Sequence, residues 1–145
     1  MKRRLEFVFA SVLTIFLVQI ASHSQQKPSV ADEVKKGQYL VNEVAKCSEC
    51  HTPRDENNQL DQDRLLAGAP IWIQPVRPMP NWGEYAPALA GLSEFSDAQA
   101  KLVLEMGEGA GGTAIEPPMH TYHMNDSDAQ AVIAYLRSLP PPMVH

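Results

Sequence analysis

Apolar positions recur with a helical period in three stretches of the chain, and long segments rich in proline and glycine separate these stretches. In the first, which runs into Cys47, the apolar residues are Val34, Leu40, Val41, Val44 and Ala45. Their spacing of roughly 3.6 residues is typical of an amphipathic helix. The pattern therefore predicts a first helix that begins near Val34 and ends near Cys47.

A second helix is predicted from its start and stop signals. Ser96 followed by Gln99 is a capping-box pattern, in which each side chain bonds the backbone N–H of the other residue. Gly107 is a typical helix terminator. We expect the inward-facing side chains of this helix to be Leu102, Val103 and Met106.

The last predicted helix has the clearest apolar stripe. Its inner face comprises Ala129, Val132, Ile133 and Leu136. Either Asn125 or Ser127 is a suitable N-cap residue. Three consecutive prolines that begin at Pro140 end the helix, because proline cannot continue it.

Residues 52–92, between the first two helices, show neither a helical nor a strand period. Six prolines interrupt this stretch: Pro53, Pro70, Pro75, Pro78, Pro80 and Pro87. Such long loops are uncommon in a small domain unless something other than secondary structure organises them. The whole pattern predicts an all-α fold of about three to four helices with long Pro/Gly-rich loops, in which a large apolar cofactor completes the core.

The N-terminal segment has the three parts of a secretory signal peptide. Residues 2–4 are basic, residues 7–18 are uncharged and apolar, and Ser22 and Ser24 suit cleavage after residue 24. The apolar run is shorter than the about 20 residues that span a bilayer comfortably, and only an uncleaved segment would associate the protein with a membrane. We predict export to the periplasm, with a signal peptide at 1–24, a polar linker at 25–33, a domain at 34–140 and a tail at 141–145.

Composition and charge limit which kinds of molecule the protein can bind. Hydrophobic residues make up 44% of the 145 positions and charged residues 20%, which argues against a disordered chain. The chain has 12 Lys and Arg against 17 Asp and Glu, and its formal net charge is −5. An acidic chain is poorly suited to nucleic acid, and it favours a protein partner with a basic docking face.

The strongest motif is Cys47-Ser48-Glu49-Cys50-His51. This C-x-x-C-H pattern is the attachment signal for c-type haem, because two thiols can bond one haem edge while the adjacent imidazole ligates the iron. A structural disulfide, a thioredoxin-like redox pair and a zinc site are alternatives, but the redox pair expects a βαβ context and zinc needs further ligands. We predict one covalent haem c, bound by Cys47 and Cys50, with His51 as the proximal iron ligand.

Two segments of the chain resemble class I cytochromes c. Residues 37–55 (GQYLVNEVAKCSECHTPRD) are similar to the haem-binding stretch of monohaem domains associated with bacterial dehydrogenases, and residues 117–141 resemble the family's axial-methionine loop and final helix. Residues 56–95 match weakly. The resemblance implies a cytochrome c fold in which the first and last helices cross, with Gly37 close to Tyr135 and Leu136.

The resemblance also implies that Met119 is the sixth, distal iron ligand. A thioether is a soft, neutral ligand that favours Fe(II) relative to a second imidazole and raises the reduction potential. Met79, which lies in a Pro-Met-Pro setting, and the two nearby histidines, His120 and His123, remain alternatives.

Other side chains are candidates for supporting contacts. The Nδ1–H of His51 needs an acceptor, and the candidate is the carbonyl of Pro70. Arg54 is either a partner of a haem propionate or a surface cation. Three aromatic residues are expected to pack against the haem or the helices, with hydrogen bonding to a haem propionate as the alternative: Trp72, Trp82 and Tyr85. Met124 is expected to pack at the start of the last helix or to form a wall of the haem pocket.

These features predict an electron-transfer protein that is not itself an enzyme and has no catalytic residue. If protein side chains fill both axial positions, no substrate reaches the iron, and the haem exchanges single electrons with redox proteins through its edge. One alternative is a cytochrome subunit fixed in a larger dehydrogenase or oxidase complex. Another is a haem catalyst or gas sensor with an open distal site.

Overall fold

The computed structural model describes residues 28–142, so the predicted signal peptide and the last three residues of the tail lie outside the described residues. The elements are α2 (Val30–Tyr39), η1 (Leu40–Val44), α3 (Ser48–His51), η2 (Gln62–Arg64), β1 (Ala69–Pro70), β2 (Tyr85–Ala86), η3 (Ala90–Leu92), α4 (Asp97–Met106), η4 (Ala110–Gly112) and α5 (Asp126–Ser138). Helices dominate this part of the chain, which confirms the predicted fold class. None of its helices has the length and apolar character needed to cross a membrane.

Helix α2 begins earlier than the apolar pattern predicts. Ser29 caps it by accepting a hydrogen bond from the backbone N–H of Asp32, and the Asp32 side chain completes a capping box. Residues 30–33, predicted as part of a polar linker, are therefore helical. The predicted start of the helix, near Val34, was too far along the chain because it was based on apolar residues, whereas the capping residues Ser29 and Asp32 are polar. After Tyr39 the chain continues as the π-helical turn η1.

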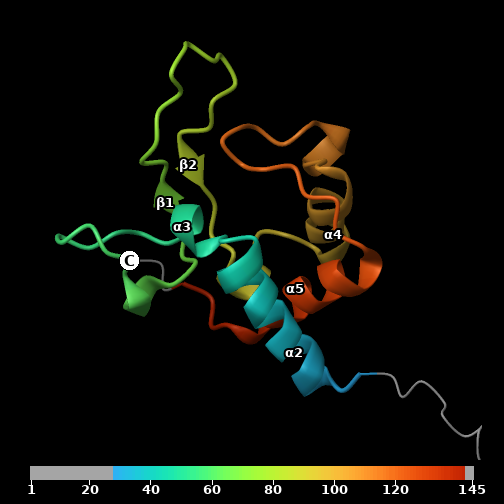
Figure 1. Ribbon diagram of the computed structural model, residues 1–145. Helices are drawn as coiled ribbons and strands as arrows, with labels where there is room; N and C mark the ends of the chain where they lie inside the picture. Colours follow the sequence, from blue (N-terminus) through green and yellow to red (C-terminus); the bar gives the residue numbers. More distant parts are fainter. Residues whose placement is uncertain (1–27, 143–145) are drawn as a thin grey trace, which may run out of the picture.

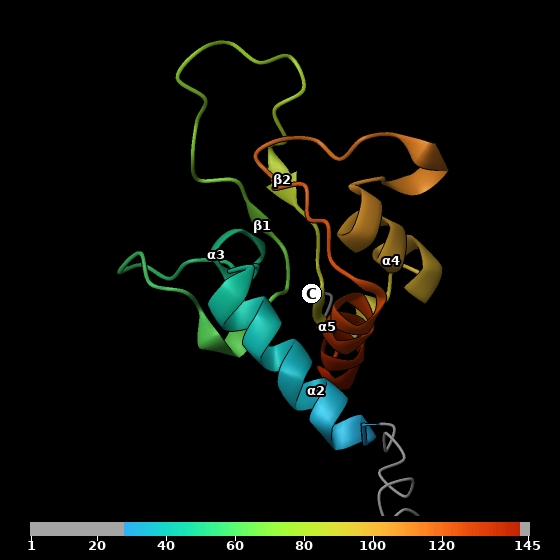
Figure 2. The same ribbon diagram turned by 45° about the vertical axis from the view of Figure 1, so that its right-hand side comes forward.

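Helices α2 and α5 cross in close contact (Figures 1 and 2). At the crossing, a Cβ atom on Gly37 would lie 1.9 Å from the carbonyl oxygen of Ala131 and 2.7 Å from Cβ of Tyr135. Only glycine leaves room for this approach. Tyr135 and Leu136 are both buried, so the crossing implied by the family resemblance is confirmed.

The core lies where α5 meets α2, η1, η3 and α4. The four predicted inner residues of α5 are all buried, at 0–8% exposure: Ala129, Val132, Ile133 and Leu136. Asn125 is the N-cap residue, because its side chain accepts a hydrogen bond from the backbone N–H of Asp128. The helix ends at Ser138, before the proline run, as its sequence predicts.

Helix α4 has the predicted ends but a different inner face. Ser96 and Gln99 form the capping box, and Gly107 takes the left-handed conformation at the C-terminus. Ala100 and Leu104 are the buried residues, whereas Leu102 is 44% and Met106 58% exposed. The inward orientation predicted for Leu102 and Met106 was wrong. That prediction assumed that the largest apolar side chains face inward, whereas the face of α4 that packs against the core contains Ala100 and Leu104.

The proline-rich stretch forms a long projection, the arm (residues 71–84), which rises from β1 and β2 (Figures 1 and 2). The antiparallel pairing of Ala69 with Ala86 and of Pro70 with Tyr85 closes its base. Within the arm, Nε1 of Trp82 donates to the carbonyl oxygen of Ile73 over 3.3 Å. The arm therefore has a defined course without a helix of its own.

Candidate functional site

The three motif residues Cys47, Cys50 and His51 share one helical turn. Cys47 is the N-cap residue of α3, and its carbonyl oxygen accepts hydrogen bonds from the backbone N–H groups of Cys50 and His51 over 3.3 and 3.0 Å. Both thiols are free and half-buried. Because residues three apart are neighbours on a helix, the turn brings both sulfur atoms and the imidazole into one small region.

His51 is buried, with an exposed fraction of 6%, and its ring orientation is fixed. Its Nδ1 atom lies 2.7 Å from the carbonyl oxygen of Pro87. A carbonyl oxygen only accepts, so Nδ1 carries the proton and Nε2 keeps a free lone pair. The predicted acceptor, Pro70, was wrong. Pro70 lies in β1, whereas Pro87 directly follows β2. Which of the two carbonyls faces His51 depends on how the strands pair, and the sequence carries no signal for that pairing.

Burial also sets the protonation states at the motif. Loss of solvent lowers the pKa of His51, although the hydrogen bond with Pro87 opposes this shift. Burial raises the pKa of the Cys47 thiol to about 11 and also raises the pKa of Cys50. At neutral pH the imidazole is therefore neutral and both thiols are protonated, unlike the low-pKa thiolate of a reactive redox cysteine.

The zinc-site interpretation of the cysteines gains no support from the fold. Across residues 28–142, no group of three or more His, Cys, Asp or Glu side chains is arranged to hold a metal ion. Cys47 and Cys50 are not joined by a disulfide. The arrangement instead fits a cofactor that bonds two thiols and takes one imidazole nitrogen.

Arg54 and Trp72 cover the outer side of α3. Nη2 of Arg54 lies 3.0 Å from Oε2 of Glu49, and Nη1 donates to the carbonyl oxygen of Asn58. The guanidinium carbon lies 4.8 Å from the ring centre of Trp72, whose Nε1 donates to the carbonyl oxygen of Glu49. Arg54 thus has protein partners.

The aromatic side chains expected to pack differ in exposure. Trp72 is 59% and Tyr85 60% exposed, and their packing against a haem stays a prediction. Trp82 is half-buried in the arm. Met124 packs against the core, and its backbone N–H donates to the carbonyl oxygen of Leu104 over 3.0 Å.

Met119 lies in the loop between α4 and α5, and its side chain is half-buried. Its backbone N–H donates to the carbonyl oxygen of Glu116 over 3.2 Å. Two residues earlier, the carbonyl oxygen of Pro117 accepts a hydrogen bond from Gly83 of the arm over 2.7 Å. The alternative methionine, Met79, is 46% exposed.

Tyr122 is a residue of this region that the sequence did not single out. Its hydroxyl donates to the carbonyl oxygen of Ala45 over 2.9 Å, across 77 residues of sequence. Burial raises its pKa to about 12, and charge on the neighbouring Cys47 and Cys50 adds to the shift. The ring of His120 contacts it edge-on, with 5.1 Å between centroids. The Met119 loop is thereby joined to the end of η1.

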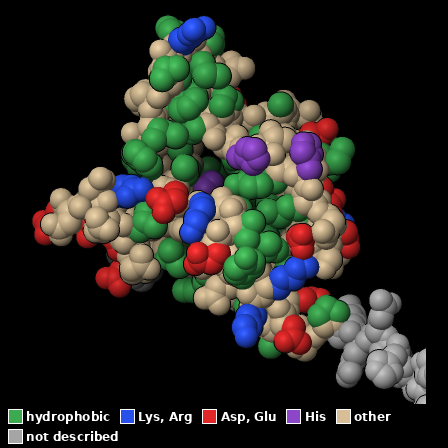
Figure 3. Space-filling model, in the orientation of Figure 1, with side chains coloured by type: hydrophobic (Ala, Val, Ile, Leu, Met, Phe, Trp, Pro, Cys, Tyr) green, Lys and Arg blue, Asp and Glu red, His purple; other side chains and the backbone are tan. Residues whose placement is uncertain are grey.

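A hollow lies on the same side of the molecule as the motif. In the space-filling view, hydrophobic side chains gather around a depression between the part that carries α3 and β2 and the part that carries α4, and a histidine side chain is visible inside it (Figure 3). An apolar depression on the side of the molecule that carries α3, the helix that contains the buried His51, suits a large apolar ring system. The residues present therefore fit a covalently bound haem.

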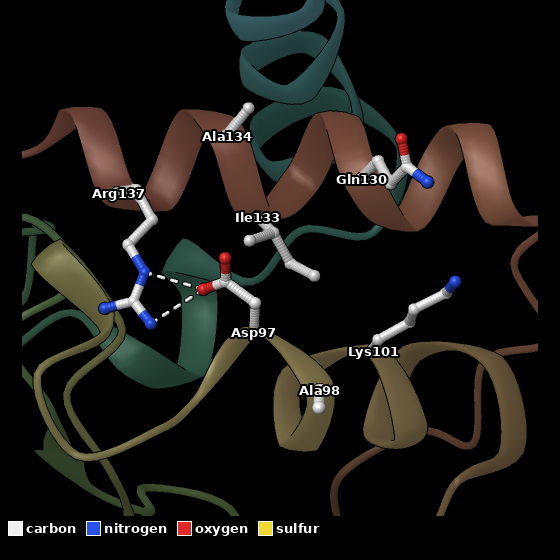
Figure 4. Close-up of a pocket in the computed structure, with 7 residues that line it drawn as sticks. All are labelled: Asp97, Ala98, Lys101, Gln130, Ile133, Ala134 and Arg137. Atoms are coloured by element: carbon white, nitrogen blue, oxygen red, sulfur yellow. Dashed lines mark hydrogen bonds and ion pairs between the residues drawn. The ribbon is translucent and has the colours of Figure 1, made fainter.

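A second concavity lies between α4 and α5 and has a different character. It has a volume of about 310 Å³, and it contains none of the motif residues (Figure 4). Arg137 points across it to Asp97, and the two form an ion pair of 2.7 Å. All the residues that line it belong to α4 and α5, so it is the groove between these two packed helices.

The cytochrome c family model matches residues 34–140. The chain belongs to the cytochrome c family. It is 32% identical to the fructose dehydrogenase cytochrome subunit of Gluconobacter japonicus, over 96% of this chain and 30% of that protein. It is 34% identical to the cytochrome c subunit of the quinone alcohol dehydrogenase of Gluconobacter oxydans, over 77% of this chain and 25% of that protein.

Another relative, a dihaem c-type cytochrome of Cereibacter sphaeroides, is 33% identical over 77% of this chain and 37% of its own length. The chain thus spans between 25% and 37% of the length of these three relatives. The family match confirms the predicted cytochrome c fold and the general role in electron transport. A cytochrome c domain implies covalent c-type haem, and the C-x-x-C-H motif at residues 47–51 fits that cofactor.

Proposed function

We propose that this protein is a periplasmic carrier of single electrons with one haem c, and that it is not an enzyme by itself. Cys47 and Cys50 bond the haem, His51 is the proximal ligand and Met119 the distal ligand. The observation that carries this proposal is the buried, neutral imidazole of His51, held by the carbonyl of Pro87 within the turn that contains both cysteines. When bound, the haem supplies one-electron exchange between Fe(III) and Fe(II).

Each residue has a distinct task in this mechanism. The two cysteines would hold the haem at α3, so that the imidazole of His51 would stay at high effective concentration near the iron. The bond from Nδ1 of His51 to Pro87 fixes the tautomer and raises the basicity of the Nε2 lone pair. Met119 contributes a weakly basic sulfur that favours the reduced state. If His51 and Met119 both bound the iron, they would keep substrates from it.

The proposed electron donor is a bacterial dehydrogenase. The relatives named as cytochrome subunits of fructose and alcohol dehydrogenases support this proposal, and they also favour a second possibility, a subunit fixed in such a complex. The formal net charge of −5 suits a partner with a basic docking face. The proposal includes export by a signal peptide at 1–24 and a haem domain at 34–140.

Optical spectra of the oxidised and reduced protein test the ligand assignment. The oxidised protein should have an iron–thioether charge-transfer band, and Met119→Ala should abolish this band. Met79→Ala is the matched control, because it removes the alternative methionine from the exposed arm, and it should leave the band intact.

Carbon monoxide separates the carrier from a catalyst or gas sensor. The reduced wild-type protein should bind CO slowly or incompletely, because Met119 occupies the distal position, and Met119→Ala should bind it rapidly. Rapid, complete binding to the wild type contradicts a filled distal site. A charge-transfer band that survives in Met119→Ala but disappears in Met79→Ala contradicts Met119 as the ligand.

A further inference from the structure

We propose that Tyr122 is the positioning residue that holds the Met119 loop in its ligating position, through its hydrogen bond to the end of η1. The inference rests on the proposed His51/Met119 ligation. It assigns to Tyr122 a task separate from metal binding: the hydroxyl keeps the part of the loop around Met119 close to the segment that leads into the two motif cysteines.

Hydrogen bonds of Pro117, Tyr122 and Met124 join the Met119 loop to other parts of the described chain. The carbonyl oxygen of Pro117 accepts from the backbone N–H of Gly83. The hydroxyl of Tyr122 donates to the carbonyl oxygen of Ala45. The third is the backbone bond from Met124 to Leu104 at the start of α5. Met119 lies between the first two points, and Tyr122 is the attachment that reaches the segment leading into Cys47.

The acceptor is a carbonyl that the helix itself leaves unpaired. Ala45 is the C-cap residue of η1, and the last carbonyls of a helix have no partner within it. The backbone N–H of Ala45 closes the π turn on Leu40, while its carbonyl receives the Tyr122 hydroxyl. This bond therefore gives the carbonyl of Ala45 a partner and connects the Met119 loop to the end of η1.

The phenol is suited to a fixed, uncharged bond. Tyr122 is half-buried, and with its pKa raised to about 12 its hydroxyl remains a donor at neutral pH. The edge-on contact with His120 restricts the ring on the loop side. Replacing Tyr122 by Phe keeps this ring and its packing volume and removes only the hydroxyl, so the effect of the bond can be isolated.

Loss of the bond should increase the fraction of molecules in which the loop has moved away from the iron. A neutral hydrogen bond of typical net strength corresponds to about a fivefold change in such an equilibrium. When CO must wait for Met119 to leave, its observed binding rate follows that fraction. We therefore expect Tyr122→Phe to accelerate CO binding to the reduced holoprotein about fivefold, with the thioether band of the oxidised form still present.

Tyr135→Phe is the matched control. Tyr135 is buried in α5, and its hydroxyl accepts a hydrogen bond from Nδ2 of Asn42 over 3.4 Å. This variant also loses a tyrosine hydroxyl and a long-range bond, but it leaves the Met119 loop untouched. It should bind CO at the wild-type rate, and far-UV circular dichroism during thermal unfolding should report how much each variant loses in general stability.

The inference is overturned if Tyr122→Phe binds CO at the wild-type rate, or if Tyr135→Phe accelerates binding to the same extent. Met119→Ala distinguishes the source of a failure. If that variant retains the thioether band, the proposed ligation fails and this inference fails with it. If that variant loses the band while Tyr122→Phe still binds CO at the wild-type rate, the ligation stands and only the role of Tyr122 is wrong.

Discussion

At the scale of single residues, the segment that follows the motif is joined to the long loop by individual hydrogen bonds. The carbonyl oxygen of His51 accepts from the backbone N–H of Gly68 over 2.8 Å. The hydroxyl of Thr52, which is 2% exposed, accepts from the backbone N–H of Leu66 over 2.9 Å. Together with the bond from Nδ1 of His51 to the carbonyl oxygen of Pro87, these contacts hold the end of α3 and the imidazole in place.

Thr52→Val should therefore destabilise the protein although it preserves the shape of the side chain. The substitution leaves the buried N–H of Leu66 without an acceptor, which costs about 1–3 kcal/mol of the free energy of unfolding. Denaturant titration followed by circular dichroism measures the loss. Thr52→Ser keeps the hydroxyl and should lose less, and equal losses in both variants would show that the methyl group, rather than the bond, matters.

The motif residues could be predicted from the sequence, but most of their supporting residues could not. The C-x-x-C-H spacing specifies its own chemistry within five consecutive residues. The acceptor for His51 depends instead on which strand segments pair, and the partner of Tyr122 is a carbonyl that a π turn leaves free. Carbonyl acceptors are present at every residue, so no sequence pattern distinguishes Pro87 or Ala45.

At the scale of elements, the crossing of α2 and α5 requires Gly37. Any Cβ atom at this position would overlap the backbone of Ala131, and backbone of a packed helix cannot move aside as a flexible side chain can. Gly37→Ala should reduce the free energy of unfolding by about 3 kcal/mol or more, since the two helices must separate.

Gly109→Ala is the control for this substitution. Gly109 has an ordinary φ of −82°, and the nearest atom to an added Cβ is the carbonyl oxygen of Thr113 at 3.5 Å. Its stability should stay within about 0.5 kcal/mol of the wild type. Thermal or denaturant unfolding measures both variants, and a tolerated Gly37→Ala would contradict the crossing.

Arg137 in α5 forms hydrogen bonds that hold the segment 91–97, which leads into α4, against α5. Its guanidinium donates to the carbonyl oxygens of Gly91, Leu92 and Phe95 and to the carboxylate of Asp97. Arg137→Lys keeps the charge but loses the planar array of donors, so we expect a loss of about 1–2 kcal/mol in the free energy of unfolding. Arg64→Lys, at an exposed ion pair with Asp61, should change it by less than about 0.5 kcal/mol. Equal effects would contradict the fastening role.

The ends of the elements were easier to predict than their faces. Ser96, Gln99 and Gly107 mark α4 because capping chemistry is local, and the stripe on α5 is regular enough to identify its buried side. On α4 the same reasoning failed for Leu102 and Met106, because the direction a short helix faces depends on its neighbours. The start of α2 was missed because the capping pair of Ser29 and Asp32 lies in a polar segment.

At the scale of the whole molecule, the architecture follows from the family resemblance, while the course of residues 52–92 does not follow from the sequence. That stretch has no period, and it is organised by single long-range bonds such as those from Leu66 to Thr52 and from Gly83 to Pro117. The net charge, in contrast, can be read directly from the composition, and it should affect the rates of electron exchange with charged reagents.

The acidic charge predicts opposite salt effects for two small redox reagents. Reduction of the ferric protein by the cation hexaammineruthenium(II) should slow as ionic strength rises, because salt screens the attraction. Oxidation of the ferrous protein by the anion hexacyanoferrate(III) should accelerate. We expect changes of about threefold or more between ~0.01 M and ~0.5 M salt in stopped-flow measurements. Rates that do not respond to salt would contradict electrostatic steering by this surface.

The central claim is that Cys47 and Cys50 bind a haem covalently, and the mass of the denatured protein tests it most directly. Purified protein, unfolded and freed of unbound cofactor, should retain the mass of one haem and give the pyridine haemochrome spectrum of a porphyrin with two thioether bonds. The double variant Cys47→Ser, Cys50→Ser should lose the added mass. A colourless wild-type protein that has been exported and folds cooperatively without the added mass would contradict the account.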